Sequence, residues 1–264
     1  MAGVFRDGLF EGRTAFVAGG TSGINLGIAE RFADLGAAVT VVSRSPEKVD
    51  TAVRHLQARG ARAFGQACDV REYDAIEAAL SAAAAHFGPI DMLVSGAAGN
   101  FVARALDMSA KGFRTVVDID LLGTFNVLRA AHAHLRKPGA AIVNISAPQA
   151  YMPMPGQSHV GAAKAGVDML TRNLAVEWGR DGIRVVSIVP GPIEDTEGMR
   201  RLGAAPGARE KLERSIPLGR YGRKGEIADL AAFLCSDAAQ YVTGAVVVCD
   251  GGQSLLGSHG FLPD

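Results

Sequence analysis

The sequence predicts a single α/β domain in which a doubly wound parallel sheet carries helices on both faces. Three observations lead to this prediction. Short apolar runs of the kind that form buried strands alternate with helical patterns along the whole chain. Glycine-rich turns follow several of these runs. No linker, low-complexity segment or short repeat divides the 264 residues, so we expect one domain over residues 1–264.

Composition and charge exclude several classes of protein. Apolar residues make up 48% of the chain and charged residues 20%, which is typical of a globular domain. The formal net charge is zero, so no basic field favours nucleic acid. Three widely spaced cysteines, Cys68, Cys235 and Cys249, predict neither a disulfide framework nor a metal site. No membrane-spanning run and no secretory or C-terminal peroxisomal signal is evident, so we expect a cytoplasmic protein without a membrane partner.

Hydrophobic periodicity assigns each element in turn. The predicted strands are residues 14–18, 38–42, 63–67, 90–95, 141–145, 183–189 and 245–249. The predicted helices are residues 24–35, 47–59, 73–87, 110–136, 158–178 and 226–234. Residues 194–217 are rich in glycine and arginine and show little pattern, which predicts a mobile lid over a bound substrate.

The turn after the first strand has the context of a dinucleotide-binding site. Residues 19–23 read Gly-Gly-Thr-Ser-Gly and connect a buried strand to a helix. Such a turn lets backbone N–H groups approach a pyrophosphate at the helix N-terminus, where the helix dipole favours anions. The predicted phosphate-binding residues are Gly19, Thr21, Ser22, Gly23 and Ile24.

The end of the second strand indicates which nicotinamide cofactor is bound. An acidic residue at this point would bind the ribose 2′-hydroxyl of NAD, but the sequence has Arg44 followed by Ser45. A guanidinium suits a 2′-phosphate, so NADP(H) is preferred over NAD(H). The alternative is that Arg44 is a solvated surface residue.

The predicted helix over residues 110–136 carries an acidic residue on its apolar face. Phe113, Val116, Leu121 and Leu128 fall on one stripe, and Asp120 lies within it. A buried carboxylate is costly unless it is paired or hydrogen-bonded, so Asp120 is either satisfied by a neighbour or used in chemistry. The apolar surroundings can raise the pKa of such a carboxyl, which suits a proton donor.

Taken together, the motifs resemble the short-chain dehydrogenase/reductase family over almost the whole chain. The matching segments are residues 19–24 (Gly-Gly-Thr-Ser-Gly-Ile), 68–70 (Cys-Asp-Val), 96–99 (Gly-Ala-Ala-Gly), 144–146 (Asn-Ile-Ser), Lys164, 190–192 (Pro-Gly-Pro) and 250–252 (Asp-Gly-Gly). The resemblance implies a Rossmann-type sheet of about seven strands, an NAD(P) cofactor and a homotetramer. It also implies further cofactor contacts at Asp69, Val70, Lys164, Pro190, Gly191, Ile193 and Thr196.

Several positions depart from the family pattern. The family tyrosine should lie four residues before Lys164, where this chain has Val160, and the family serine falls at Ala147. The helix asparagine of the family falls at Asp120, and the third glycine of the fingerprint is Asn25. Ketone reduction needs an acid near the carbonyl oxygen. We therefore expect chemistry other than simple ketone–alcohol exchange.

One branch of the family has the same replacements. The chain resembles 2,4-dienoyl-CoA reductases of the peroxisomal type at residues 97–101, 118–120, 123–127, 174–179, 191–193, 196–198 and 200–203, and at His159. The tyrosine of the mitochondrial type would fall at Gln149. This resemblance implies NADPH-dependent reduction of a conjugated dienoyl thioester to 3-enoyl-CoA in unsaturated fatty-acid oxidation. It assigns Asp120 and Lys164 as the catalytic pair. It assigns acyl-CoA contacts to Arg71, Phe101, Ser109, Lys111 and Arg201.

Two other functions remain open from the residues alone. The chain could act on another substrate, with Tyr151 or His159 supplying the acid. It could also bind the nucleotide without catalysis, which Val160 and Ala147 would favour. A protein that binds the nucleotide without catalysis would not need Asp120 on an apolar helix face or an arginine-rich segment over residues 194–217.

Overall fold

The computed structural model describes residues 4–196, 199 and 207–256, and within them seven strands form one parallel sheet. The strand order is β3-β2-β1-β4-β5-β6-β7, so the predicted doubly wound sheet is confirmed. The order reverses between β1 and β4, where such sheets form a crevice beyond the strand ends. The strands are β1 (Thr14–Ala18), β2 (Ala38–Ser43), β3 (Ala63–Ala67), β4 (Met92–Ser95), β5 (Ala141–Ile145), β6 (Arg184–Pro190) and β7 (Val246–Cys249).

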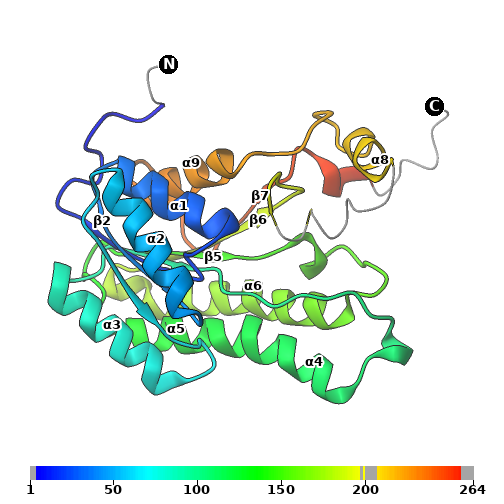
Figure 1. Ribbon diagram of the computed structural model, residues 1–264, viewed down its shortest axis with the longest axis horizontal. Coiled ribbons are helices and arrows are strands. Elements are labelled where there is room, and N and C mark those ends of the chain that lie inside the picture. Colours follow the sequence, from blue (N-terminus) through cyan, green and yellow to red (C-terminus); the bar gives the residue numbers. More distant parts are fainter. Residues whose placement is uncertain (1–3, 197–198, 200–206, 257–264) are drawn as a thin grey trace.

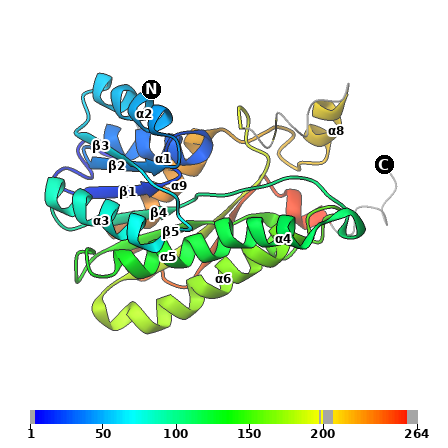
Figure 2. The same ribbon diagram turned by 60° about the horizontal axis from the view of Figure 1, so that its bottom comes forward.

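Helices cover both faces of this sheet (Figure 1, Figure 2). One layer contains α1, α2 and α9, and the other contains α3 to α6. The helices are α1 (Gly23–Asp34), α2 (Pro46–Ala58), α3 (Tyr73–Phe87), α4 (Ala110–Val117), α5 (Gly123–Ala131), α6 (Ser158–Trp178), α8 (Ala208–Arg214) and α9 (Lys224–Cys235).

Alternate side chains of each strand supply the two cores. In β1, Ala15 and Val17 pack toward α1 and α9, whereas Phe16 and Ala18 pack toward α3 and α5. Because both faces are covered, all five residues of β1 are buried, as are those of β5. This explains why the central strands appear in the sequence as unbroken apolar runs and not as alternating ones.

The single helix predicted over residues 110–136 is wrong in detail. The chain forms α4, then a π-helical turn η2 (Asp118–Leu122), and then α5, which ends at Ala131. The N–H of Gly123 bonds the carbonyl of Asp118, five residues back. Phe113, expected on the buried stripe, is 37% exposed, whereas Val116 on the same stripe is buried. Periodicity alone does not reveal an inserted residue of this kind, and such turns are frequent at functional sites.

The predicted lid lies partly outside the described residues, as does Arg201. Its C-terminal part contains α8, a helix that the sequence did not predict. A charged segment without an apolar stripe gives little helical signal, and here an ion pair of 2.9 Å joins Arg209 to Glu213 one turn later. In the described part of the chain, no helix is both long and apolar enough to cross a membrane.

Candidate active site

A cavity of about 430 Å³ opens at the crevice between β1 and β4. Its walls come from the turn after β1, the ends of β2 and β3, and residues 96–98 after β4. It brings together seven of the residues that the sequence predicted to hold the cofactor, namely Gly19, Thr21, Ser22, Arg44, Ser45, Asp69 and Val70. Ser22 makes no side-chain cap to α1, so the first N–H groups of this helix have no capping side chain. The donors and the space therefore suit a dinucleotide.

Asn25 replaces the third glycine of the fingerprint without closing this crevice. Its Nδ2 donates to the carbonyl oxygen of Gly96 at 2.7 Å, which ties α1 to the loop after β4. A Cβ atom added at Gly96 would lie 2.2 Å from Asn25 Oδ1. The asparagine thus fills space that the absence of a side chain at position 96 leaves open.

Two basic residues line the part of the cavity near the N-terminus of α2. Arg44 follows β2, and Lys48 lies in the first turn of α2. The Lys48 backbone N–H is capped by Ser45 Oγ at 3.3 Å. Sequence reasoning identified Arg44 but missed Lys48, because a lysine on a surface helix carries no signal without its spatial neighbours.

Asp69 and Arg71, which the sequence assigned to different ligands, bind each other. The Arg71 guanidinium donates to both carboxylate oxygens, with Nη2 to Oδ2 at 2.6 Å. This hydrogen bonding is the main cause that lowers the pKa of Asp69. In this structure Arg71 therefore pairs with the predicted adenine contact, and its role as an acyl-CoA contact stays a prediction.

The predicted catalytic pair meets inside the protein. Lys164 Nζ lies 3.4 Å from Asp120 Oδ2, and the two side chains are 6% and 1% exposed. The ammonium also donates to the Ile145 carbonyl at the end of β5 at 2.9 Å. Asp120 Oδ1 accepts the N–H of Gly99 at 2.7 Å. A surface lysine, the simplest alternative for Lys164, is thus excluded, and η2, α6 and two strand ends converge on one buried ion pair.

The vacated family positions offer no acid in this structure. Ala147 and Val160 occupy the serine and tyrosine positions, and Val160 is 3% exposed. Tyr151 is 48% exposed after the short helix η3 (Pro148–Ala150). His159 is fully buried, and its ring packs 4.6 Å from the ring of Phe101. The pair formed by Asp120 and Lys164 is therefore the candidate for the proton chemistry at this site.

Three of the predicted acyl-CoA contacts lie close together. Phe101 is 38% exposed and is next to the N-terminus of α4, where a Cβ atom at Gly112 would lie 3.3 Å from its ring. Ser109 caps this helix, with Oγ accepting the Gly112 N–H at 3.0 Å, and Lys111 follows on the exposed first turn. The loop is held in place because Gln157 Nε2 donates to the Phe101 carbonyl at 3.0 Å.

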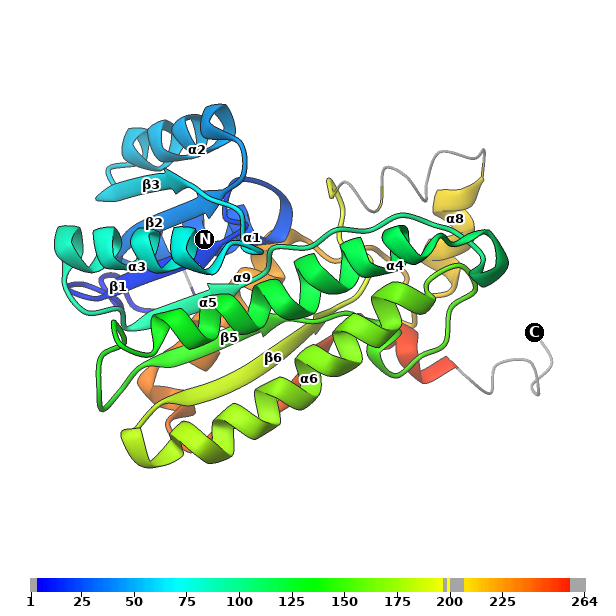
Figure 3. The same ribbon diagram turned by 90° about the horizontal axis from the view of Figure 1, so that it is seen from below.

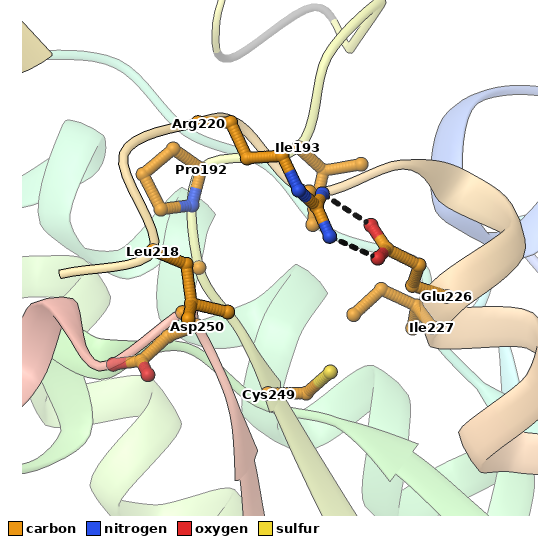
Figure 4. Close-up of a pocket in the computed structure, with 11 residues that line it drawn as sticks. Pro192, Ile193, Leu218, Arg220, Glu226, Ile227, Cys249 and Asp250 are labelled. Carbon is orange, nitrogen blue, oxygen red and sulfur yellow. Dashed lines mark hydrogen bonds and ion pairs between the residues drawn. The ribbon is translucent and has the colours of Figure 1, made fainter. Parts of the chain in front are cut away.

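A smaller cavity of about 90 Å³ lies behind the segment after β6 (Figure 4). Gly191 and Ile193, predicted cofactor contacts, line this cavity and not the larger one. Gly222 bonds the backbone of both Pro192 and Glu194 at 2.9 Å, which ties the start of the predicted lid to a residue beyond its end. Thr196, another predicted contact, donates its hydroxyl to the Ile193 carbonyl at 2.8 Å.

Sequence reasoning missed a second buried carboxyl, Asp168, which lies one helical turn after Lys164. It is 5% exposed, and its Oδ1 has no hydrogen-bond partner among the described residues. Burial raises the pKa of this carboxyl, although the Ser146 and Ser187 hydroxyls and the charges of Arg172 and Lys164 oppose the effect. An acidic residue at a buried position of the α6 stripe was the available signal.

We expect Gly96→Ala to destabilise the protein by about 1–3 kcal/mol, because the new methyl group would overlap Asn25. The cost should shrink to roughly 0.5 kcal/mol or less in an Asn25→Ala background, since the three nearest atoms all belong to that side chain. Urea unfolding of the single and double variants measures this coupling. Gly225→Ala, which has no atom within 4 Å of its added Cβ, is the control. Additive costs would contradict the proposed contact.

We expect Asp168→Asn to raise Tm more at pH 8 than at pH 4.5. The pKa of Asp168 is higher in the folded protein than in the unfolded chain. The carboxyl therefore lowers the free energy of unfolding progressively as the pH rises above the pKa that Asp168 has in the unfolded chain. The amide removes that penalty, and each kcal/mol corresponds to about 2–4 °C. Asp91→Asn is the control for loss of a buried carboxylate, which accepts the Thr14 N–H at 2.9 Å, and it should lower Tm. An equal change at both pH values would show that Asp168 titrates normally.

Known proteins resemble this chain along nearly its whole length. Residues 18–254 match the family described as Enoyl-(Acyl carrier protein) reductase. Peroxisomal 2,4-dienoyl-CoA reductase of Pongo abelii is 46% identical over 254 residues, which cover 96% of this chain and 87% of the relative. Probable 2,4-dienoyl-CoA reductase of Bacillus subtilis is 40% identical over 248 residues, covering 93% and 98%.

Solved structures show the same architecture. A gluconate 5-dehydrogenase from Burkholderia cenocepacia, in complex with NADP and tartrate, superposes with a TM-score of 0.88 at 32% identity, covering 93% of this chain and 96% of the other. A citronellol catabolism dehydrogenase from Pseudomonas aeruginosa gives a TM-score of 0.84 at 36% identity, covering 96% and 100%. With the seven-stranded sheet and the buried lysine described above, these matches place the chain in the short-chain dehydrogenase/reductase family.

Proposed function

We propose that this protein is an NADPH-dependent 2,4-dienoyl-CoA reductase that forms 3-enoyl-CoA. The buried pair of Asp120 and Lys164 carries the proposal, because it stands beside the vacant positions Ala147 and Val160. A carbonyl reductase would need a hydroxyl acid at those positions. The relatives named as 2,4-dienoyl-CoA reductases support the same substrate class.

The residues around the larger cavity fit a dinucleotide. Gly19 has a φ of +77°, and a Cβ atom there would lie 2.9 Å from the backbone of Ala97, so only glycine leaves this wall open. Arg44 and Lys48 supply positive charge for a 2′-phosphate, which supports NADPH over NADH. Bound NADPH supplies the hydride that reaches the far end of the conjugated diene.

The chain's own residues handle the charge and the proton. Reduction leaves negative charge spread onto the thioester oxygen, and a proton must then reach carbon. Lys164 brings a buried positive charge, held at the end of β5 by the Ile145 carbonyl. Asp120 delivers the proton, through water, from its position beside the ammonium. Because both groups are shielded from solvent, their electrostatic influence on the reacting thioester is stronger than it would be in water.

Exposed apolar side chains suit an acyl chain at the mouth of the site. Phe101, Val102 and Leu106 are 38%, 70% and 97% exposed on the loop that precedes α4. Single exposed apolar residues are ordinary, but three within six residues beside the proposed CoA contacts favour a hydrophobic substrate. The segment over residues 194–217 is our candidate for a lid over this surface, and it includes Arg201, which lies outside the described residues.

Assembly and compartment are proposals as well. In the helical layer that contains α5 and α6 (Figure 3), the exposed apolar side chains include Leu122 of η2, Phe125 of α5, and Met169 and Val176 of α6. These side chains support the homotetramer that the family resemblance implies. A cytoplasmic location stays a proposal, and relatives from animals, a plant and yeast are named peroxisomal.

NADPH oxidation with hexadienoyl-CoA tests the function, and Asp120→Ala tests the assignment of the acid. We expect the variant to lose about 10²–10⁴-fold in kcat, the usual contribution of a positioned acid, while its Kd for NADPH is unchanged. Asp118→Ala, two residues earlier and half-buried, is the matched control and should retain activity. The assignment of Asp120 fails if its removal leaves kcat intact. The function fails if the folded wild-type protein does not turn over the substrate.

Arg44→Ala and Lys48→Ala should each raise KM for NADPH by about 10–100-fold and leave KM for NADH nearly unchanged. Each removes a charge-assisted contact to the 2′-phosphate worth roughly 1.5–3 kcal/mol, and NADH has no such phosphate. Arg54→Ala is the control, because Arg54 is an exposed residue of α2 outside this cavity. Steady-state rates with both cofactors measure the effect. Equal losses with NADPH and NADH would contradict a 2′-phosphate site.

A further inference from the structure

The hydrogen bonds of Asp120 conflict with its proposed role as an acid. Its Oδ1 accepts the Gly99 N–H at 2.7 Å, and its Oδ2 faces the Lys164 ammonium at 3.4 Å. Both neighbours are donors, and donors bind a carboxylate better than a carboxylic acid. Neither contact offers an acceptor to which a protonated Asp120 could donate. A proton for turnover must be stored close by and moved to Asp120 when it is needed.

A second carboxyl lies on the same face of α6 as Lys164. Asp168 follows Lys164 by four residues, which places the two side chains one above the other on the helix. It is 5% exposed, and its Oδ1 lacks a hydrogen-bond partner in the described part of the chain. The roles proposed for Asp120 and Lys164 do not involve the Asp168 carboxyl.

The neighbours of Asp168 do not neutralise a negative charge by a close contact. From its own helix, the charges that act on it are those of Arg172 and Lys164. From β6 and the residue after β5, the groups that approach it are the hydroxyls of Ser187 and Ser146. From η2, the charged group is Asp120, which already pairs with Lys164. Burial accordingly raises the pKa of Asp168, so its protonated form is favoured.

The charge count leads to the same result. Asp120, Lys164 and Asp168 are each at least nine-tenths buried, and they comprise two acids and one base. If both acids were ionised, the group would hold an uncompensated negative charge away from water, which is costly. The group is therefore most stable with an ammonium, one carboxylate and one carboxylic acid. Groups that interact in this way titrate together, so each observed pKa describes the three groups jointly and not a single residue.

We propose that Asp120, Lys164 and Asp168 share one titrating proton, and that Asp168 is a positioning residue which stores it. The proposal rests on the proposed function. In the resting protein the proton is on Asp168, and Asp120 is ionised. For turnover, Asp168 releases its proton as Asp120 takes one up, so the negative charge moves from Asp120 to Asp168 and Lys164 remains an ammonium. After Asp120 has protonated the substrate carbon, one proton enters from solvent.

Kinetics of Asp168→Asn test this proposal in the intact enzyme. The amide cannot accept the displaced negative charge, so we expect kcat with hexadienoyl-CoA to fall by at least 10-fold while Kd for NADPH stays unchanged. The alkaline limb of the kcat profile should move to lower pH, because Asp120 must then be protonated from solution. Asp168→Glu should restore much of the rate. The control is Asp91→Asn, which should leave the pH profile unchanged. Asp91 is also a buried carboxyl, but it precedes the first residue of β4, at the edge of the sheet away from the site.

Carboxyl titration by NMR, with ¹³C-labelled aspartate, provides a readout that needs no turnover. The Asp168→Asn variant identifies the resonance. In Asp120→Asn, the competing negative charge is gone, so Asp168 should ionise at lower pH than in the wild-type protein. An unchanged Asp168 titration, or a wild-type pH profile in Asp168→Asn, would overturn the proposal. If the wild-type protein does not reduce the dienoyl-CoA, the proposed function fails, and the titration still decides whether the three groups share a proton.

Discussion

The buried contact between Lys164 and Asp120 is the interaction on which the site depends. Removing two opposite charges from water is costly, and their attraction offsets the cost only when the remaining donors and acceptors are satisfied. Here the Ile145 carbonyl takes one ammonium N–H, and the Gly99 N–H supports the carboxylate. The backbone at the end of β5 and after β4 therefore has a second role besides forming the sheet. It provides the groups that make this ion pair tolerable inside the protein.

The surrounding architecture follows from bringing these strand ends together. A Cβ atom at Gly99 would lie 2.9 Å from Ile119 Cδ1, so the loop after β4 packs closely against η2. The π-helical turn η2 then presents Asp120 beside α6, where Lys164 and Asp168 share a face. On the other side of the crevice, Asn25 joins α1 to Gly96 and lines the larger cavity. The larger cavity and the buried ion pair thus meet at the loop over residues 96–99.

Much of this arrangement was predictable because it is encoded locally. Buried strands produce apolar runs, helices produce stripes, and the glycine-rich turn marks the first strand end. The predicted element bounds agree with the structure within a few residues except at residues 110–136 and at α8. The π-helical turn shifts the apolar stripe of this helix by one residue. A shift of one residue is too small to be recognised in the hydrophobic pattern of the sequence. Helix α8 is stabilised by contacts such as the pair formed by Arg209 and Glu213, not by an apolar face.

By itself, the sequence determined the parallel sheet, the burial of Asp120 on a helix face, and the replacement of the family acid by Ala147 and Val160. Only the tertiary structure decided which groups face one another across different elements. It placed Arg71 on Asp69, and it revealed Asp168 as a second acid near Lys164. The physical reason is that periodicity reports which side of an element is buried. The partner on that side is chosen by the packing of residues that are distant in the chain.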